Sequence, residues 1–179
     1  MVPHGTLLYL LWRDPQRFPR AATLTYAVFN VGACAYWLIP TAPPWWAAGM
    51  DERTGRGAAD VRRMMVEYGE DFWQDGWGSL YSVFGGNPLA AMPSLHFATS
   101  VMAALLLAEG GPVAGTVGSA YTATLGFALV YLGEHYVVDL LAGAALTLAV
   151  RRAGRRAGPV VARLGRGLSA LGDLAREAG

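Results

Sequence analysis

Four stretches of this 179-residue chain are nearly free of charged residues and are the right length for membrane-crossing helices. They cover residues 21–40, 93–108, 112–132 and 134–150, and a bilayer-spanning helix needs about 20 apolar residues. Only residues 109–111 separate the second stretch from the third, so these two must form an antiparallel hairpin. The pattern predicts an all-α, polytopic transmembrane helical bundle with about four spans.

The long segment between the first and second stretches, residues 41–92, has a pattern of its own. From residue 60 to residue 73 apolar side chains recur at helical spacing. Such a pattern predicts an amphipathic helix that lies in the membrane interface. This helix includes Arg62 and Arg63 and is expected to cover a site on the outer face.

Composition strengthens the membrane interpretation and narrows the function classes. Hydrophobic residues make up 54% of the chain and charged residues 15%, a balance that is rare in soluble domains. The net charge of +1 gives no reason to expect a nucleic-acid partner. Cys34 is the single cysteine, so the sequence offers no disulfide framework and no thiolate metal site.

The arginines predict the orientation of the chain in the membrane. Because basic residues accumulate on the cytoplasmic side, both termini are expected to be cytoplasmic and the 41–92 loop to lie outside. All 14 basic residues are Arg, and Gly and Ala are abundant, which indicates a bacterial protein of the inner membrane. The predicted domains are a cytoplasmic N-terminal segment (1–20), a membrane-embedded domain (21–150) and a basic cytoplasmic tail (151–179). The arginines that flank the spans are Arg13, Arg17, Arg20, Arg151, Arg152, Arg155 and Arg156.

Two short polar motifs begin the second and fourth stretches, and the predicted topology brings both to the outer face. AMPSLHF contains Ser94 and His96, and GEHYVVD contains His135 and Asp139. An ionisable side chain near the bilayer core costs roughly 2 to 3 kcal/mol, which makes these residues candidates for function.

The first motif is suited to binding an anion. Pro93 is expected at the first helical position, which leaves the amides of residues 94–96 free to face a phosphate. The hydroxyl of Ser94 adds a donor, and Asn87 lies just upstream, where the backbone can approach a ligand.

The second motif is suited to nucleophilic catalysis. His135 and Asp139 are four residues apart, which would place them on one helix face. Asp139 would then fix the tautomer of the imidazole, and the other ring nitrogen would act as nucleophile or base. His96 would stand nearby to protonate a leaving oxygen.

The order PSLH, then a span, then GEHYVVD resembles the second and third motifs of the type-2 phosphatidic acid phosphatase superfamily. The segment YWLIPTAPPWW, residues 36–46, resembles its inositol phosphorylceramide synthase branch, which includes bacterial inositolphosphotransferase-like proteins. The resemblance implies transfer of a lipid phosphate through a phosphohistidine, without a metal or other cofactor. By motif position it implies His135 as nucleophile, Asp139 as its orienting group, His96 as acid and Ser94 as phosphate ligand. Arg62 and Arg63 of the outer loop are the candidates to replace the family's phosphate-binding basic residues, and Asn87 is a further candidate from its place beside the first motif.

The chain differs from the family pattern in three respects that bear on the expected activity and topology. Leu129 stands where the phosphatases have an arginine, which favours the transferase branch. Arg13 and Arg20 imitate the spacing of the first family motif, but we reject that match because both are predicted to be cytoplasmic. The family usually has six spans, and the apolar run at residues 6–12 is interpreted as the remnant of a further helix.

The sequence therefore predicts an integral membrane lipid phosphotransferase, leaning towards the inositolphosphotransferase-like type. Its expected partners are a lipid-phosphate substrate, an alcohol acceptor, membrane lipids and a second copy of the chain, since small-residue helix faces favour association. A lipid or polyprenyl phosphate phosphatase is the close alternative. Two further alternatives are a catalytically inactive or truncated scaffold, and a metal site formed by His96, His135 and Asp139.

Overall fold

The computed structural model describes residues 2–48 and 89–177, with side chains as far as residue 158. The predicted amphipathic helix at residues 60–73 lies outside the described residues, as do Arg62, Arg63 and Asn87. The described chain is helical, which confirms the predicted all-α class. Its helices are α1 (Val2–Arg13), α2 (Phe18–Leu38), α6 (Leu95–Ala108), α7 (Pro112–Tyr131) and α8 (Val137–Glu177).

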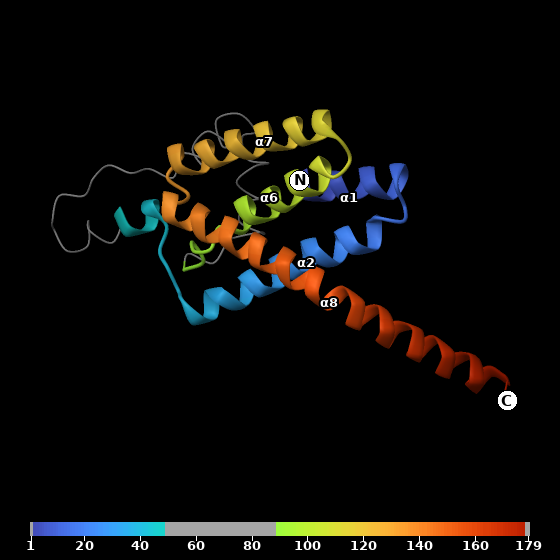
Figure 1. Cartoon of the computed structure of the whole chain (residues 1–179). Helices are drawn as coiled ribbons and strands as arrows, with labels where there is room; N and C mark the ends of the chain where they lie inside the picture. Colours follow the sequence, from blue (N-terminus) through green and yellow to red (C-terminus); the bar gives the residue numbers. More distant parts are fainter. Residues whose placement is uncertain (1, 49–88, 178–179) are drawn as a thin grey trace, which may run out of the picture.

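Helix α6 lies at the centre of the bundle and packs against the other four helices. In Figure 1, α7 runs along one side of α6 and α2 along the other, while the C-terminal part of α8 extends past the bundle. The core is formed by apolar side chains of α1, α2 and α6. It consists of Leu10, Ala21, Leu24, Val28, Ala98, Met102 and Leu106.

Small residues allow α6 to approach its neighbours closely. A Cβ atom on Gly115 of α7 would lie 2.9 Å from Cα of Ala108, and one on Gly143 of α8 would lie 2.7 Å from the carbonyl oxygen of Ser94. Both distances are shorter than real Cβ contacts. Gly115 and Gly143 therefore permit close packing of α7 and α8 on α6.

Each of the four predicted stretches forms a helix, but two boundaries differ from the prediction. Helix α8 continues without a break to Glu177, so the basic tail is an extension of the fourth helix. The N-terminal segment contains α1, which packs against α2 and α6 and buries Leu10 to 2% exposure. The apolar run at residues 6–12 thus belongs to a helix of the bundle.

Among the described residues, α7 alone is both long enough and apolar enough to cross a membrane by length and composition. Helix α6 is apolar but shorter. The number of spans remains a prediction.

Candidate active site

Ser94 caps α6 and connects it to α8. Its side-chain oxygen accepts a hydrogen bond from the amide of Phe97 at 3.4 Å, and its own amide donates to the carbonyl oxygen of Asp139 at 3.0 Å. Pro93 therefore precedes the cap and does not occupy the first helical position. The amide of Ser94 was predicted to be free, but it is hydrogen-bonded. Because Ser94 is fully buried, its shown role is to position the start of α6, and its binding of phosphate remains a prediction.

A tight turn between α7 and α8 positions His135. The amides of Glu134 and His135 both donate to the carbonyl oxygen of Leu129, at 3.0 and 3.1 Å. Gly133 adopts a φ of 71°, which side-chain-bearing residues rarely adopt. His135 thus lies before α8, which begins at Val137. The prediction that His135 and Asp139 share a helix face is therefore wrong.

The turn nevertheless brings His135 and Asp139 together. Nδ1 of His135 lies 3.5 Å from Oδ2 of Asp139, and both side chains are almost entirely buried. The same carboxylate oxygen accepts a hydrogen bond from the amide of Tyr136 at 2.8 Å, which fixes it in the first turn of α8. A separation of 3.5 Å exceeds the usual hydrogen-bond length, so Nδ1 has no hydrogen bond within the described part of the chain.

Burial keeps His135 in the form that can act as a nucleophile. It lies outside the helices, and desolvation lowers the pKa of its imidazole below the ordinary value, while the charge of Asp139 acts in the opposite direction. Protonation of His96 would lower this pKa further. The imidazole of His135 is therefore neutral at neutral pH, with a ring lone pair available.

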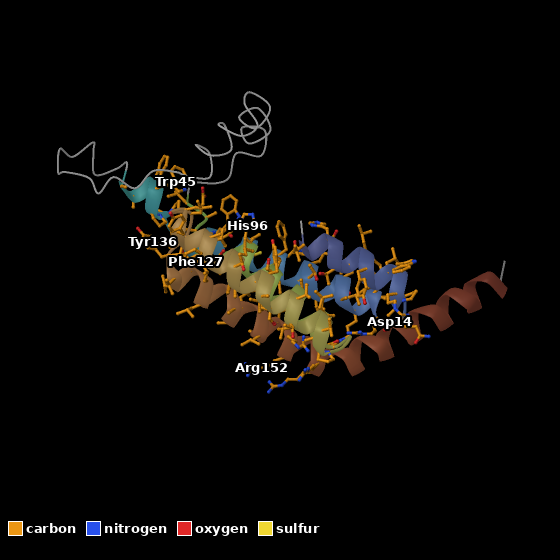
Figure 2. All side chains as sticks on the ribbon, turned by 90° about the horizontal axis from the view of Figure 1, so that it is seen from above. Asp14, Trp45, His96, Phe127, Tyr136 and Arg152 are labelled. Atoms are coloured by element: carbon orange, nitrogen blue, oxygen red, sulfur yellow. The ribbon has the colours of Figure 1, made fainter. Side chains whose placement is uncertain are left out.

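His96 and His135 line the same cavity, which has a volume of about 620 Å³. His96 lies in the first turn of α6 and is exposed. The remaining walls come from α1, α2, α7 and the segment that follows α2, including Leu7, Phe29, Pro43, Trp45 and Tyr121. Figure 2 shows Trp45 and His96 towards one end of the bundle and Asp14 towards the other. The structure thus brings four of the predicted residues, Ser94, His96, His135 and Asp139, to one place.

Two residues that hold this site were not singled out from the sequence. The hydroxyl of Tyr36 donates to the carbonyl oxygen of Pro93 at 3.0 Å. Thr41 accepts a hydrogen bond from the amide of Met92 at 2.7 Å, and its backbone pairs with Leu89 and Ala91. Both belong to the 36–46 segment that carried the family resemblance, but no local pattern assigns them these contacts.

The opposite end of α6 is closed by charge pairs. Glu109 accepts hydrogen bonds from Arg17 at 3.0 Å, Arg20 at 2.8 Å and Arg151 at 2.5 Å. Burial raises the pKa of the Glu109 carboxyl, but the hydrogen bonds from Arg20 and Arg17 outweigh this effect and leave the pKa below its ordinary value. Because Arg20 is held at this end, it is remote from His96, which supports the rejection of Arg13 and Arg20 as a family motif.

The alternative of a metal centre receives no geometric support from the described residues. Within them, no three His, Cys, Asp or Glu side chains form a group that could hold a metal ion. Leu129, at the position of the family arginine, is buried and lines the cavity with its apolar side chain.

Comparison with known proteins identifies relatives of the chain and its family. The chain is 28% identical over 163 residues to the catalytic subunit of inositol phosphorylceramide synthase of Schizosaccharomyces pombe, covering 82% of this chain and 37% of that protein. It is 30% identical over 125 residues to the inositol phosphorylceramide synthase of Candida albicans, covering 67% and 26%. No solved structure matches.

The chain spans about a third of the length of these curated relatives. The model of the PAP2 superfamily, in contrast, matches residues 1–153, which include both polar motifs and every described residue of the cavity. As the motifs predicted, this chain belongs to the PAP2 superfamily.

Proposed function

We propose that this protein is an integral membrane enzyme that transfers a phosphate-bearing group from a lipid to an alcohol through a phosphohistidine at His135. The observation that carries this proposal is the cavity in which His135, backed by Asp139, faces the same space as His96. A buried neutral imidazole beside a carboxylate is the arrangement required of a nucleophile with an orienting group.

The reaction proceeds in two steps that use the same residues. A ring nitrogen of His135 attacks the phosphorus atom, the bond from phosphorus to the leaving oxygen breaks, and His96 donates a proton to that oxygen. Asp139 stabilises the positive charge that develops on the His135 ring. In the second step the acceptor oxygen attacks phosphorus, the phosphorus–nitrogen bond breaks, and His96 takes the proton of the acceptor. Neither step requires a metal ion.

The surface of the bundle supports a membrane location. Large apolar side chains are exposed on α1, α2, α7 and α8, and Trp12, Trp37 and Leu38 are each more than 80% exposed. In α7 only 28% of the most apolar window is buried, whereas the core helix of a soluble protein is mostly buried. Exposure of so much apolar surface is unfavourable in water and favourable in lipid.

The charge distribution supports the proposed orientation. Arg17, Arg20 and Arg151 gather around Glu109 at the end of α6 that is remote from His96. With basic residues on the cytoplasmic side, the active site lies at the outer face of the membrane and the end of α8 that carries Arg151 lies towards the inside. Helix α1 begins at the cavity, which Pro3 and His4 line, and ends near Arg17. This orientation therefore places the start of α1 towards the outer face, in contrast to the predicted cytoplasmic N-terminal segment.

Transfer is favoured over hydrolysis by two observations. The curated relatives are named as synthases, and the position of the phosphatase arginine holds buried Leu129. A lipid phosphatase is the second candidate, because the same phosphohistidine can be resolved by water.

The test is to measure phosphate release and phosphorylation of an added alcohol by the purified protein in mixed micelles that contain a lipid phosphomonoester. Wild type and His135→Ala are compared with and without a chelator. We expect activity that survives chelation and is lost in the variant, with the phosphorylated alcohol as the main product when an alcohol is present. Activity that chelation abolishes, or that His135→Ala retains, would overturn the mechanism, and free phosphate alone would assign the protein to the phosphatases.

A further inference from the structure

Glu134 is a buried carboxylate in the wall of the cavity that the phosphohistidine chemistry does not use. It directly precedes His135 and is 8% exposed. Among the described residues that line the cavity it is the sole carboxylate. It lines the same cavity as His96 and His135, so it lies near both histidines.

A carboxylate at this position is unfavourable for binding a phosphate. Two negative charges at short range repel each other, and the repulsion is stronger in a partly buried site than in water. Burial of the carboxylate also costs free energy unless hydrogen bonds compensate. Glu134 already interacts with another group of the protein, but an ionised carboxylate has about four lone-pair sites. It can therefore also accept a hydrogen bond from a ligand.

The backbone fixes the carboxylate relative to the nucleophile. The amides of Glu134 and His135 share the carbonyl oxygen of Leu129 as acceptor. Because both side chains start from one turn, a ligand atom bound by Glu134 is held at a constant distance from His135. This is the requirement for positioning a second substrate beside a phosphorylated histidine.

Other polar groups of the cavity also present hydrogen-bond acceptors. The hydroxyls of Thr25, Thr99 and Ser100 line the cavity. Each donates its own proton to a backbone carbonyl oxygen of its helix, at 2.9, 2.7 and 2.8 Å. Their oxygen lone pairs remain to accept hydrogen bonds. A ligand that complements these oxygens and Glu134 carries several hydroxyl donors and no negative charge.

We infer that Glu134 forms the acceptor subsite and binds a hydroxyl group of a neutral polyol, an inference that rests on the proposed function. One hydroxyl of the polyol attacks phosphorus, the bond from phosphorus to His135 breaks, and the proton of that hydroxyl passes to His96. A second hydroxyl donates a hydrogen bond to Glu134. Glu134 takes no proton, and its contribution is to position the acceptor and to disfavour anionic alcohols.

The test uses the full-length protein in mixed micelles containing dioleoyl phosphatidic acid, with glycerol and glycerate as acceptors. Glycerol is neutral, and glycerate is an anionic alcohol with the same number of carbon atoms. The ratio of phosphorylated acceptor to free phosphate is measured for wild type, for Glu134→Gln, and for the matched control Asp14→Asn. Asp14 lies at the opposite end of the bundle near Arg17.

We expect the wild type to prefer glycerol to glycerate, and Asp14→Asn to share that preference. In Glu134→Gln the ratio of transfer to hydrolysis with glycerol falls about tenfold, since a hydrogen bond to a charged group is lost, and the preference for glycerol over glycerate narrows. If Glu134 only orders the site, phosphorylated glycerol and free phosphate fall in proportion in Glu134→Gln. A ratio of transfer to hydrolysis equal to that of the wild type therefore overturns the inference and leaves the proposed function intact.

A second variant covers the case in which Glu134→Gln does not fold. Glu134→Asp keeps the charge but withdraws the carboxylate by one methylene group, so the ratio with glycerol should fall while the preference against glycerate persists. An unchanged ratio in Glu134→Asp again contradicts the inference. Absence of all turnover in the wild type overturns the proposed function itself, and with it the acceptor subsite.

Discussion

The two ends of helix α6 both carry charged or ionisable side chains, but their partners differ. At the C-terminal end, Glu109 is surrounded by three arginines, Arg17, Arg20 and Arg151, and its carboxylate oxygens are occupied by them. At the N-terminal end, His96 and His135 face a cavity of about 620 Å³, and Nδ1 of His135 has no hydrogen bond within the described chain.

This difference distinguishes a structural charge cluster from the proposed active site. Groups whose hydrogen-bonding capacity is satisfied by the protein stabilise helix packing and have little left for a ligand. Groups that are buried, incompletely bonded and open to a cavity have capacity to spare, which is typical of active sites. Substitutions at the two ends should therefore affect different properties, activity at one and stability at the other.

The largest expected effect is that of His135→Ala on turnover. Removal of the proposed nucleophile should reduce the rate by at least about a thousandfold. The melting temperature should change little, because the side chain lies at the wall of an existing cavity. Turnover of the lipid phosphate and thermal unfolding in detergent are measured on the same sample. A variant that unfolds together with its loss of activity would show that this end is also structural.

Asp139→Asn should have the next largest effect, about a hundredfold or more on turnover, because the group that orients and stabilises the imidazole is lost. His135 must be neutral to attack, so activity falls as the pH drops through its pKa, which burial places below the ordinary value. The charge of Asp139 raises that pKa. Its removal should therefore shift the acidic limb of the pH–rate profile to lower pH.

The asparagine oxygen can still accept the hydrogen bond from the amide of Tyr136, so α8 should begin normally. This makes the substitution a test of electrostatics rather than of folding. An acidic limb that stays in place, or that moves to higher pH, contradicts the assigned role of Asp139.

Gly143→Ala should reduce both stability and activity, because the new Cβ would lie 2.7 Å from the carbonyl oxygen of Ser94. A backbone atom cannot move away easily, so α8 must shift relative to the start of α6. Overpacking of this kind costs typically 1 to 3 kcal/mol. Gly5→Ala is the matched control, since nothing lies within 4 Å of its added Cβ. Equal melting temperatures for the two variants would contradict the close contact between α6 and α8.

The site could be predicted from the sequence as a set of residues but not as a geometry. The apolar stretches and the tight link at residues 109–111 gave the helices and the hairpin, and two motifs at matching helix ends brought His96, His135 and Asp139 together. The predicted helix face shared by His135 and Asp139 is wrong, because Leu129 binds two amides and delays the start of α8. A spacing of four residues does not reveal such a turn.

The start of α6 illustrates a conflict between two local rules. Proline is common at the first helical position, and serine is common at the cap. In the order Pro93, Ser94, Leu95, both cannot hold, and the structure has the serine cap. Helix α1 was missed as a bundle element because its apolar run is short, and its place depends on burial of Leu10 against distant residues. Tertiary contacts of this kind leave no periodic signal.

The smallest expected effect on turnover belongs to Glu109→Gln, which removes the acidic centre of the charged end. Its pairs are partly exposed, and exposed pairs contribute about 0 to 1 kcal/mol each, so the melting temperature at neutral pH should fall only modestly. The pH dependence is more diagnostic. Because the folded-state pKa of Glu109 is below its ordinary value, its stabilising contribution is complete above that value and is lost as the pH falls through the lowered pKa.

The wild type should therefore lose part of its stability under acidic conditions, below about pH 4.5, the ordinary carboxyl value. Glu109→Gln should lack that part of the pH dependence, because the amide does not titrate. Thermal unfolding at neutral and acidic pH checks both statements. Turnover at neutral pH should stay close to that of the wild type, since the substitution leaves the cavity intact. A loss of turnover comparable to that of His135→Ala would instead mean that the charged end controls the geometry of the active site through α6.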